Sequence, residues 1–200
     1  APDARARRDL RARLGLGPGS VLIGIAAEWR PMKDHPTLLA AMRRLVEAGL
    51  DVDLVLLGAG TEADSPALLH QIAANGLGGR VHGLGPTLDP APVIRGLDIA
   101  VLASAWGEGF PNFIGEAMAS GVPVVAARVG AYETLIRDGE TGTLIPPGDA
   151  EALTAAMARW LDDPAAMAAA GRAARAHVES NHSIEAEARA LVAVYRRLLA

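Results

Sequence analysis

The sequence has no cysteine, no long apolar run and little net charge. Because cysteine is absent, disulfide bonds and cysteine-ligated zinc sites are excluded, and the reducing compartment this implies favours a cytoplasmic location. No apolar run reaches the roughly 18 residues that a membrane-spanning helix needs. The net charge of −4 gives no general attraction to nucleic acid, so no nucleic-acid partner is expected.

The composition that remains is that of a globular domain. Apolar residues make up 50% and charged residues 21% of the 200 positions. We expect one domain over residues 1–200, with an N-terminal helix or linker at 1–18 and C-terminal helices at 150–200. The C-terminal helices are rich in alanine. They are expected to pack as helices and are assigned no catalytic or binding role. The opening helix should present a solvated basic face made of Arg5, Arg7, Arg8, Arg11 and Arg13.

Six short apolar runs alternate with amphipathic stretches. Runs that are apolar on both faces and separated by helices indicate a parallel sheet covered on both sides. With right-handed crossovers, the pattern predicts an α/β fold, a Rossmann-like doubly wound parallel sheet of about six strands. The expected strands are 21–27, 53–58, 80–85, 98–104, 122–127 and 141–147.

Cations, glycines and a carboxylate follow the expected strands at their carboxyl ends, the edge where open parallel sheets bind ligands. Arg30 and Lys33 come after the first strand, Gly58 and Gly60 after the second, and Glu108 after the fourth. These residues should therefore gather at one edge of the sheet.

The stretch after the fourth expected strand predicts a helix start at this edge. Pro111 suits the first helical turn, where its missing N–H costs nothing. Free amides at the start of a helix attract phosphate, and here they would belong to Asn112, Phe113 and Ile114.

Two carboxylates, Glu108 and Glu116, flank this helix start. Carboxylates repel phosphate but accept hydrogen bonds well, so sugar hydroxyls are their natural partners. Lys33 and Arg30 would supply the countercharge for a diphosphate. The set describes a nucleotide-sugar site better than a site for a bare nucleotide.

The segment "EGFPNFIGE" resembles the E-x7-E motif of family 4 glycosyltransferases, which have the GT-B fold. The similarity continues through "EAMASGVPVVA" and "GAYETLIRDGETGTLIPPGD", and upstream it includes "KDHPTLL", "LVLLGAG" and "RVHGLG". It covers Val21 to Asp149. Several motifs in order make the resemblance specific, whereas a lone E-x7-E would be weak.

The resemblance implies a role for each matching residue. Glu108 would contact the donor sugar, Glu116 the ribose hydroxyls, and Lys33 the diphosphate, with Arg30 as a second cation. The base would pack against the loop around Arg80 to Gly83. The remaining nucleotide-sugar contacts would come from Gly58, Gly60, Arg80, Val81, His82, Gly109, Phe110, Pro111, Asn112, Phe113 and Ile114.

The resemblance also implies the reaction. Such enzymes transfer a sugar from a nucleoside diphosphate with retention at the anomeric carbon, and they need no bound metal or other cofactor. GT-B enzymes have two Rossmann domains, and this sequence matches only the donor-binding half. We therefore expect an absent N-terminal acceptor domain, little transfer by this fragment alone, and any peripheral contact with the inner membrane through the absent half.

Two positions depart from the family pattern. An arginine usually stands five positions before the lysine, and here that position is Glu28. Arg30 lies two residues later and would share a side with it in an extended segment, so Arg30 is the candidate replacement. A second glycine often follows Gly130, and here Ala131 takes its place.

Two alternatives stay open. "GAGTEA" (58–63) fits the G-x-G-x-x-A fingerprint of NAD-type Rossmann domains, although it follows the second strand and no acid stands 20 residues later. A degenerate nucleotide-binding or interaction module is the other alternative, favoured by Glu28.

Three further features are given structural interpretations. "DVD" (51–53) is expected to be a turn rather than a metal site. His35 is expected to pack at a helix start. Trp106 is expected to be a packing residue, and the alternative is that it stacks on the ligand.

Overall fold

A computed structural model describes residues 3–199. Its elements, in chain order, are α1 (Ala4–Leu14), β1 (Val21–Ala26), η1 (Pro31–Lys33), α2 (His35–Glu47), β2 (Val52–Leu57), α3 (Pro66–Ala74), β3 (Val81–Gly83), α4 (Ala91–Gly96), β4 (Ile99–Leu102), α5 (Asn112–Ala119), β5 (Val124–Ala127), α6 (Tyr132–Leu135), β6 (Gly142–Ile145), α7 (Ala150–Asp162), α8 (Pro164–Asn181) and α9 (Ile184–Leu198).

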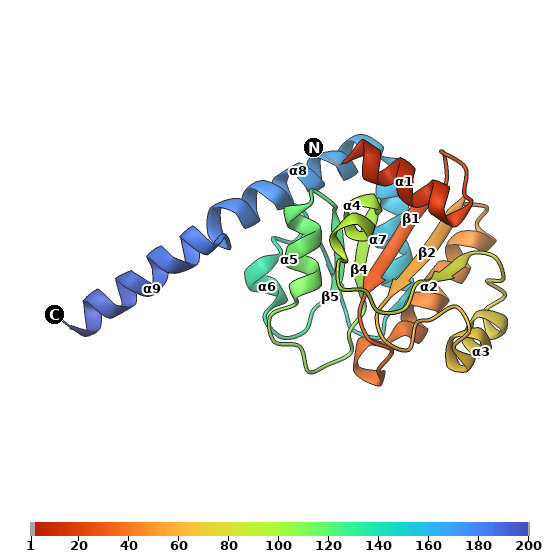
Figure 1. The fold of residues 1–200 in the computed structure, drawn as a ribbon, viewed down its shortest axis with the longest axis horizontal. Coiled ribbons are helices and arrows are strands. Elements are labelled where there is room, and N and C mark those ends of the chain that lie inside the picture. The colour runs from red at the N-terminus through yellow and green to blue at the C-terminus, as the bar shows by residue number, and fades with distance from the viewer. Residues whose placement is uncertain (1–2, 200) are drawn as a thin grey trace.

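The six strands form one parallel sheet in the order β3-β2-β1-β4-β5-β6. Helices α1, α4 and α5 lie over one face of the sheet and α2 and α7 over the other (Figure 1). The predicted doubly wound, Rossmann-like sheet is therefore confirmed. The strand order reverses between β1 and β4, which places the loops after these two strands side by side.

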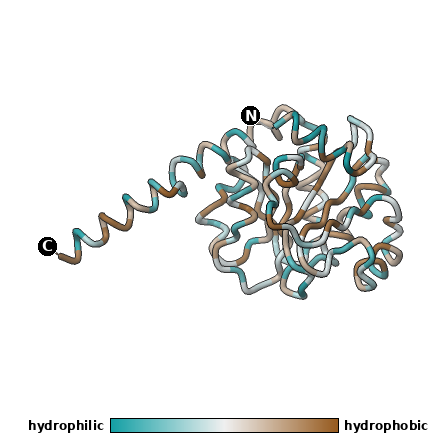
Figure 2. Tube along the Cα trace, in the orientation of Figure 1, coloured by the Kyte–Doolittle hydropathy of each residue, from teal (hydrophilic) through white to brown (hydrophobic). Residues whose placement is uncertain are grey.

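The core lies on both faces of the sheet. Every residue of β2, β4 and β5 is buried, as expected for strands covered on both sides. The apolar stretches of the tube run through the centre of the domain (Figure 2). Each covering helix contributes one apolar stripe, and in α2 the fully buried apolar members are Leu38, Leu39, Ala41, Met42 and Leu45.

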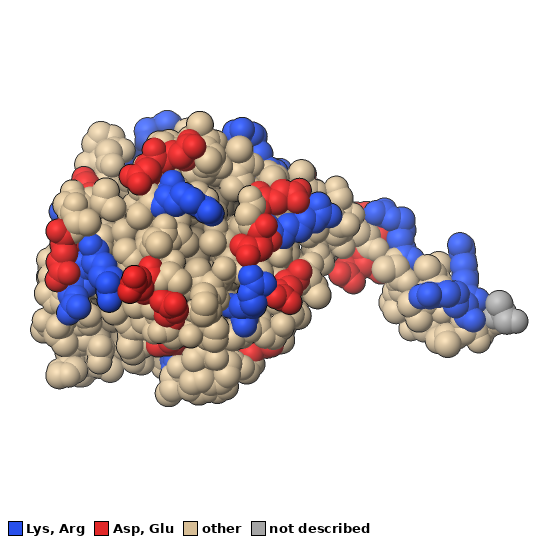
Figure 3. Space-filling view, turned by 180° about the vertical axis from the view of Figure 1, so that it is seen from behind, with Lys and Arg blue, Asp and Glu red and all other residues tan. Residues whose placement is uncertain are grey.

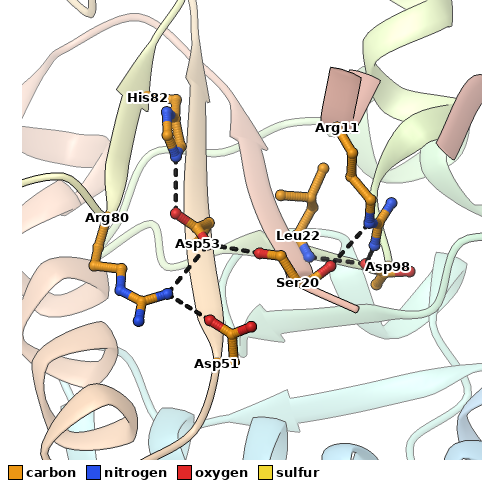
Figure 4. A network of polar contacts seen from close by, with 8 residues as sticks. All are labelled: Arg11, Ser20, Leu22, Asp51, Asp53, Arg80, His82 and Asp98. Carbon is orange, nitrogen blue, oxygen red and sulfur yellow. Dashed lines mark hydrogen bonds and ion pairs between the residues drawn. The ribbon is translucent and has the colours of Figure 1, made fainter. Parts of the chain in front are cut away.

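Helix α1 is attached to the sheet at the amino ends of its strands. The prediction that its arginines form a solvated basic face is wrong for two of them. Arg11 is buried and its Nη2 donates to Asp98 Oδ2, while Arg7 forms an ion pair with Asp98 at 3.3 Å. Asp98 Oδ2 also accepts a hydrogen bond from the Leu22 amide of β1 at 2.8 Å (Figure 4). Periodicity could not show this, since Asp98 lies 87 residues after Arg11.

The expected turn at "DVD" is also wrong, because Asp53 lies inside β2 and is fully buried. Its carboxylate accepts from Ser20 Oγ at 2.6 Å and lies 2.8 Å from His82 Nε2. Arg80 Nη1 reaches it at 3.4 Å and donates to Asp51 at 2.6 Å (Figure 4). Buried charge of this kind needs such partners.

Helix α9 extends away from the body of the domain (Figure 1). None of the α9 residues within 184–198 is buried. The expectation of packing therefore holds for α7 and α8, which bury residues such as Trp160 and Val178, but not for α9. Within residues 3–199, no helix is both long and apolar enough to cross a membrane.

Charges are mixed over the surface. Figure 3 shows basic and acidic side chains of the described residues interspersed on the face opposite that of Figure 1. Many charged side chains of the described residues form pairs, for example Arg175 with Glu179 at 2.7 Å. This face offers no continuous patch of one sign that would attract a polyanion.

Candidate donor site at the carboxyl edge

Lys33 and Glu108 meet at the point where the strand order reverses. Lys33 ends η1, which follows β1, and Glu108 lies in the loop after β4. Because β1 and β4 are neighbours in the sheet, these two loops come together beyond their carboxyl ends. This crevice is the usual ligand site of an open α/β sheet.

The two side chains form a close ion pair. Lys33 Nζ lies 2.5 Å from Glu108 Oε1, and the side chains are only 19% and 8% exposed. Ser104 Oγ donates to the same carboxylate oxygen at 2.6 Å. Lys33 is the only lysine of the chain. The structure thus brings together the predicted cation and the predicted sugar-binding carboxylate, and it adds Ser104, which the sequence did not indicate.

The loop that carries Glu108 is held on two sides. The Ala105 amide donates to the Met32 carbonyl of η1 at 2.8 Å. On the other side Gly130, with φ +57°, packs so closely that a Cβ there would lie 2.1 Å from the Glu108 carbonyl oxygen. Trp106 of the same loop is 57% exposed, so the expected packing role for Trp106 is wrong.

Helix α5 begins beside this loop, as predicted, with its first residue at Asn112 and Pro111 just before it. The Ile114 amide donates to the Pro111 carbonyl at 3.0 Å, so the expectation that it is free is wrong. Within residues 3–199, the amides of Asn112 and Phe113 have no protein acceptor and remain available to an anion.

Glu116 lies farther along α5, on its exposed side. Partial burial of its carboxyl raises the pKa of Glu116. The side chain lines an open pocket of 730 Å³ together with Phe110, His182 and Ile184. The ring of Phe110 lies against that of His182, with 5.8 Å between centroids.

The first loop contains two further predicted features. Arg30 Nε lies 2.8 Å from Glu28 Oε2, and both side chains are largely exposed. Arg30 is therefore paired with Glu28, which stands where the family usually has an arginine, and not with the Lys33–Glu108 pair.

His35 packs at the start of α2, as expected, and its ring stacks on Trp29 with 4.6 Å between centroids. Burial, reinforced by the nearby charge of Lys33, lowers the pKa of His35 to about 4, so the ring is neutral at pH 7.

Gly58 and Gly60 also lie at the carboxyl edge, after β2. Both have positive φ, and a Cβ on Gly58 would lie 2.4 Å from the Ala27 carbonyl oxygen. Only glycine allows this close approach of the two loops. A small pocket of 290 Å³ forms here with Pro86 and Thr87, which the sequence did not single out.

The structure does not bring Arg80 and His82 to this site. Both contact Asp53, and Arg80 also contacts Asp51, at the amino ends of β2 and β3. Val81 opens β3 at the same edge. The carboxyl end of β3 instead leads into the loop that carries Pro86 and Thr87.

No group of three or more His, Cys, Asp or Glu side chains that could hold a metal ion occurs within residues 3–199.

The comparisons with known families and proteins agree on one class. The family described as "Glycosyl transferases group 1" matches residues 19–163. The "Lipopolysaccharide core biosynthesis mannosyltransferase LpsB" of Rhizobium meliloti (strain 1021) is 34% identical over 198 residues, covering 96% of this chain and 56% of that protein. The protein of the same description named LpcC, from Rhizobium leguminosarum bv. viciae, is 38% identical over 197 residues, covering 97% of this chain and 55% of that protein. The chain thus spans about half the length of the curated relatives it matches.

Solved structures give the same picture. Anabaena Alr3699/HepE in complex with UDP and glucose superposes with a TM-score of 0.79 at 28% identity, covering 88% of this chain and 48% of that chain. The C-terminal domain of a glycosyl transferase group 1 family protein (LpcC) from Francisella tularensis superposes with a TM-score of 0.78 at 26% identity, covering 92% of this chain and 95% of that domain. The chain therefore belongs to the group 1 glycosyl transferases and corresponds to the C-terminal domain of a GT-B enzyme.

Proposed function

We propose that this chain is the donor-binding half of a retaining glycosyltransferase and binds a nucleoside-diphosphate sugar in the crevice beyond the carboxyl ends of β1 and β4. The observation that carries the proposal is the meeting of Lys33, Glu108 and the amino end of α5 where the strand order reverses. Anabaena HepE, a structural neighbour, is described in complex with UDP-glucose, which supports a ligand of this class.

Each part of the donor has a matching group. The Lys33 ammonium and the free amides of Asn112 and Phe113 would bind the diphosphate. The two amides are donors of fixed position. Glu108 would accept a hydrogen bond from the transferred sugar, and Glu116 from the ribose hydroxyls. Each hydrogen bond to a charged group is worth about 1.5–3 kcal/mol net.

The same groups would support catalysis. Bond cleavage leaves negative charge on the diphosphate, and preorganised donors act where that charge develops. Lys33 and the α5 amides would serve there, and removing one such donor typically costs about 3 kcal/mol, or roughly a hundredfold in rate. Glu108 would orient the sugar and stabilise positive charge at the anomeric carbon, and we assign it no nucleophilic role.

The acceptor side is a further part of the proposal. The relatives are about twice as long, and we propose that the acceptor is bound by a second domain that these 200 residues do not include. The chain alone would then bind the donor and transfer little. We propose that binding needs no metal, because Lys33 and the amide donors supply the countercharge.

Calorimetric titration with UDP, GDP, ADP and NAD, and with UDP-glucose and GDP-mannose, tests the proposal. We expect binding to at least one nucleoside diphosphate and its sugar, without added metal. Replacing Glu116 by Ala should weaken that binding by roughly ten- to a hundredfold, the equivalent of one charge-assisted hydrogen bond. Glu151→Ala, on α7, is the matched control and should bind as wild type does.

The other outcomes decide between the alternatives. Failure to bind any nucleoside diphosphate would contradict the proposal and leave a degenerate module. NAD binding without diphosphate preference would favour an NAD-type domain, although "GAGTEA" follows β2 rather than the first strand. Unchanged affinity in Arg30→Ala would refute Arg30 as the replacement cation.

A further inference from the structure

Tyr132 has a buried hydroxyl that no part of the proposed donor chemistry uses. The side chain is fully buried at the start of α6, just after the Gly130 turn. Within residues 3–199, its oxygen has no hydrogen-bond partner. Leaving a buried hydroxyl unpaired costs about 1–3 kcal/mol, so a buried and unpaired group at a site calls for a reason.

The surroundings of this hydroxyl point to Glu108. Burial raises the pKa of Tyr132 well above its usual range, and the Glu108 carboxylate adds to the effect while Ser104 opposes it. Both groups are within hydrogen-bonding reach of the phenol, but neither makes a bond of good geometry with it in the ligand-free structure. Because the phenol stays protonated, it can act as a hydrogen-bond donor at any physiological pH.

The Glu108 carboxylate already has two donors in the ligand-free structure. Lys33 at 2.5 Å and Ser104 at 2.6 Å both bind Oε1. A diphosphate would draw Lys33 away from this oxygen, because one ammonium cannot bind both groups at full strength. Glu108 would then be a buried carboxylate held by Ser104 alone, which is an unfavourable state.

Resting on the proposed function, we propose that Tyr132 is a positioning residue: its hydroxyl takes the place of Lys33 on the Glu108 carboxylate when Lys33 moves to the donor diphosphate. Ser104 keeps its bond throughout. The two hydroxyls then hold Glu108 in the orientation in which its other oxygen faces the sugar. Tyr132 itself touches no substrate atom.

A double-mutant cycle on the ligand-free protein tests this without relying on any ligand. Tyr132→Phe removes an unpaired hydroxyl, so in wild type the midpoint of chemical unfolding should stay the same or rise. In a Lys33→Met background Tyr132 already bonds to Glu108, and there Tyr132→Phe should lower the midpoint. Tyr195→Phe, on exposed α9, is the matched control and should change neither.

Titration with the nucleotide sugar that wild type binds best is the second arm. Tyr132→Phe should weaken this binding by roughly three- to tenfold, the value of one ordinary hydrogen bond. In a Tyr195→Phe background Tyr132 is the only tyrosine, and its isotope-labelled ring carbon should shift on ligand addition and in Lys33→Met.

The contradicting outcomes are distinct. If Tyr132→Phe lowers the midpoint equally with and without Lys33, the hydroxyl is merely structural and the positioning role is wrong. If Tyr132→Phe binds the nucleotide sugar as wild type does while Glu116→Ala does not, the positioning role is wrong and the proposed function stands. If wild type binds no nucleotide sugar, the proposed function fails, and the positioning role fails with it.

Discussion

At the scale of single residues, Gly130 shows how an absent side chain shapes the site. Its φ of +57° is costly for other residues, and a Cβ would lie 2.1 Å from the Glu108 carbonyl oxygen. The close approach of the Gly130 loop therefore constrains the backbone that carries the Glu108 carboxylate. Sequence alone marks the glycine but not what it touches.

Gly130→Ala should therefore weaken nucleotide-sugar binding by roughly tenfold or more, because Glu108 must move, and should destabilise the fold by about 1–3 kcal/mol. Calorimetry and chemical denaturation measure the two effects. Gly139→Ala is the matched control: its φ is +79° but its Cβ would meet nothing within 4 Å. Gly139→Ala should lose stability only, and equal loss of affinity in both variants would contradict the contact.

His35 gives a prediction for pH. Its pKa is about 4 in the folded protein and 6.5 when unfolded, so between these values only the unfolded chain takes up the proton. Stability is then fully present above pH 6.5 and falls as the pH falls towards 4, by about 3 kcal/mol in total. Denaturation at several pH values should show this slope in wild type and a smaller one in His35→Gln.

His70→Gln, at an exposed position of α3, is the control for this experiment and should keep the wild-type slope. A slope that does not change in His35→Gln would show that His35 is not the group responsible.

The site was partly predictable at this scale. Lys33, Glu108 and the α5 start could be placed together because parallel strands bring their carboxyl ends to one edge. Ser104 and Tyr132 could not, since their importance depends on which side chains meet in space. Arg80 and His82 were assigned to the wrong edge, because nothing local shows that both pair with Asp53.

At the scale of elements, a buried contact of Arg11 helps to attach α1 to the sheet. Arg11 donates to Asp98, to the Ser20 carbonyl at 2.9 Å and to the Arg7 carbonyl at 3.0 Å. The bonds to Asp98 and to Ser20 tie the helix to the starts of β4 and β1, and the bond to Arg7 lies within α1. The position of α1 was therefore not visible in its own sequence, which reads as a polar surface helix.

Arg11→Met should destabilise the protein by about 3–5 kcal/mol, since it leaves Asp98 as a buried charge with a weakened partner. Chemical denaturation measures the loss, and hydrogen exchange should show α1 opening before the sheet. Arg13→Met makes the same replacement at an exposed position of α1 and should stay within about 0.5 kcal/mol of wild type. Equal effects of the two would contradict the buried contact.

At the scale of the whole molecule, the alternation of apolar runs and helices predicted the sheet and its parallel order, because both features follow from burial on two faces. The loose placement of α9 was not predicted, since an amphipathic sequence looks the same whether or not its apolar face is covered. The account of function depends on one region only, the crevice between the loops that follow β1 and β4.

The most direct test of that account uses the single lysine. Reductive methylation with isotope-labelled methyl groups keeps the charge of Lys33 and gives one side-chain amine signal by NMR. Adding the preferred nucleotide sugar should shift this signal, with the saturation that calorimetry gives, as Lys33 leaves Glu108 for the diphosphate. Calorimetric binding with an unmoved Lys33 signal would contradict the account.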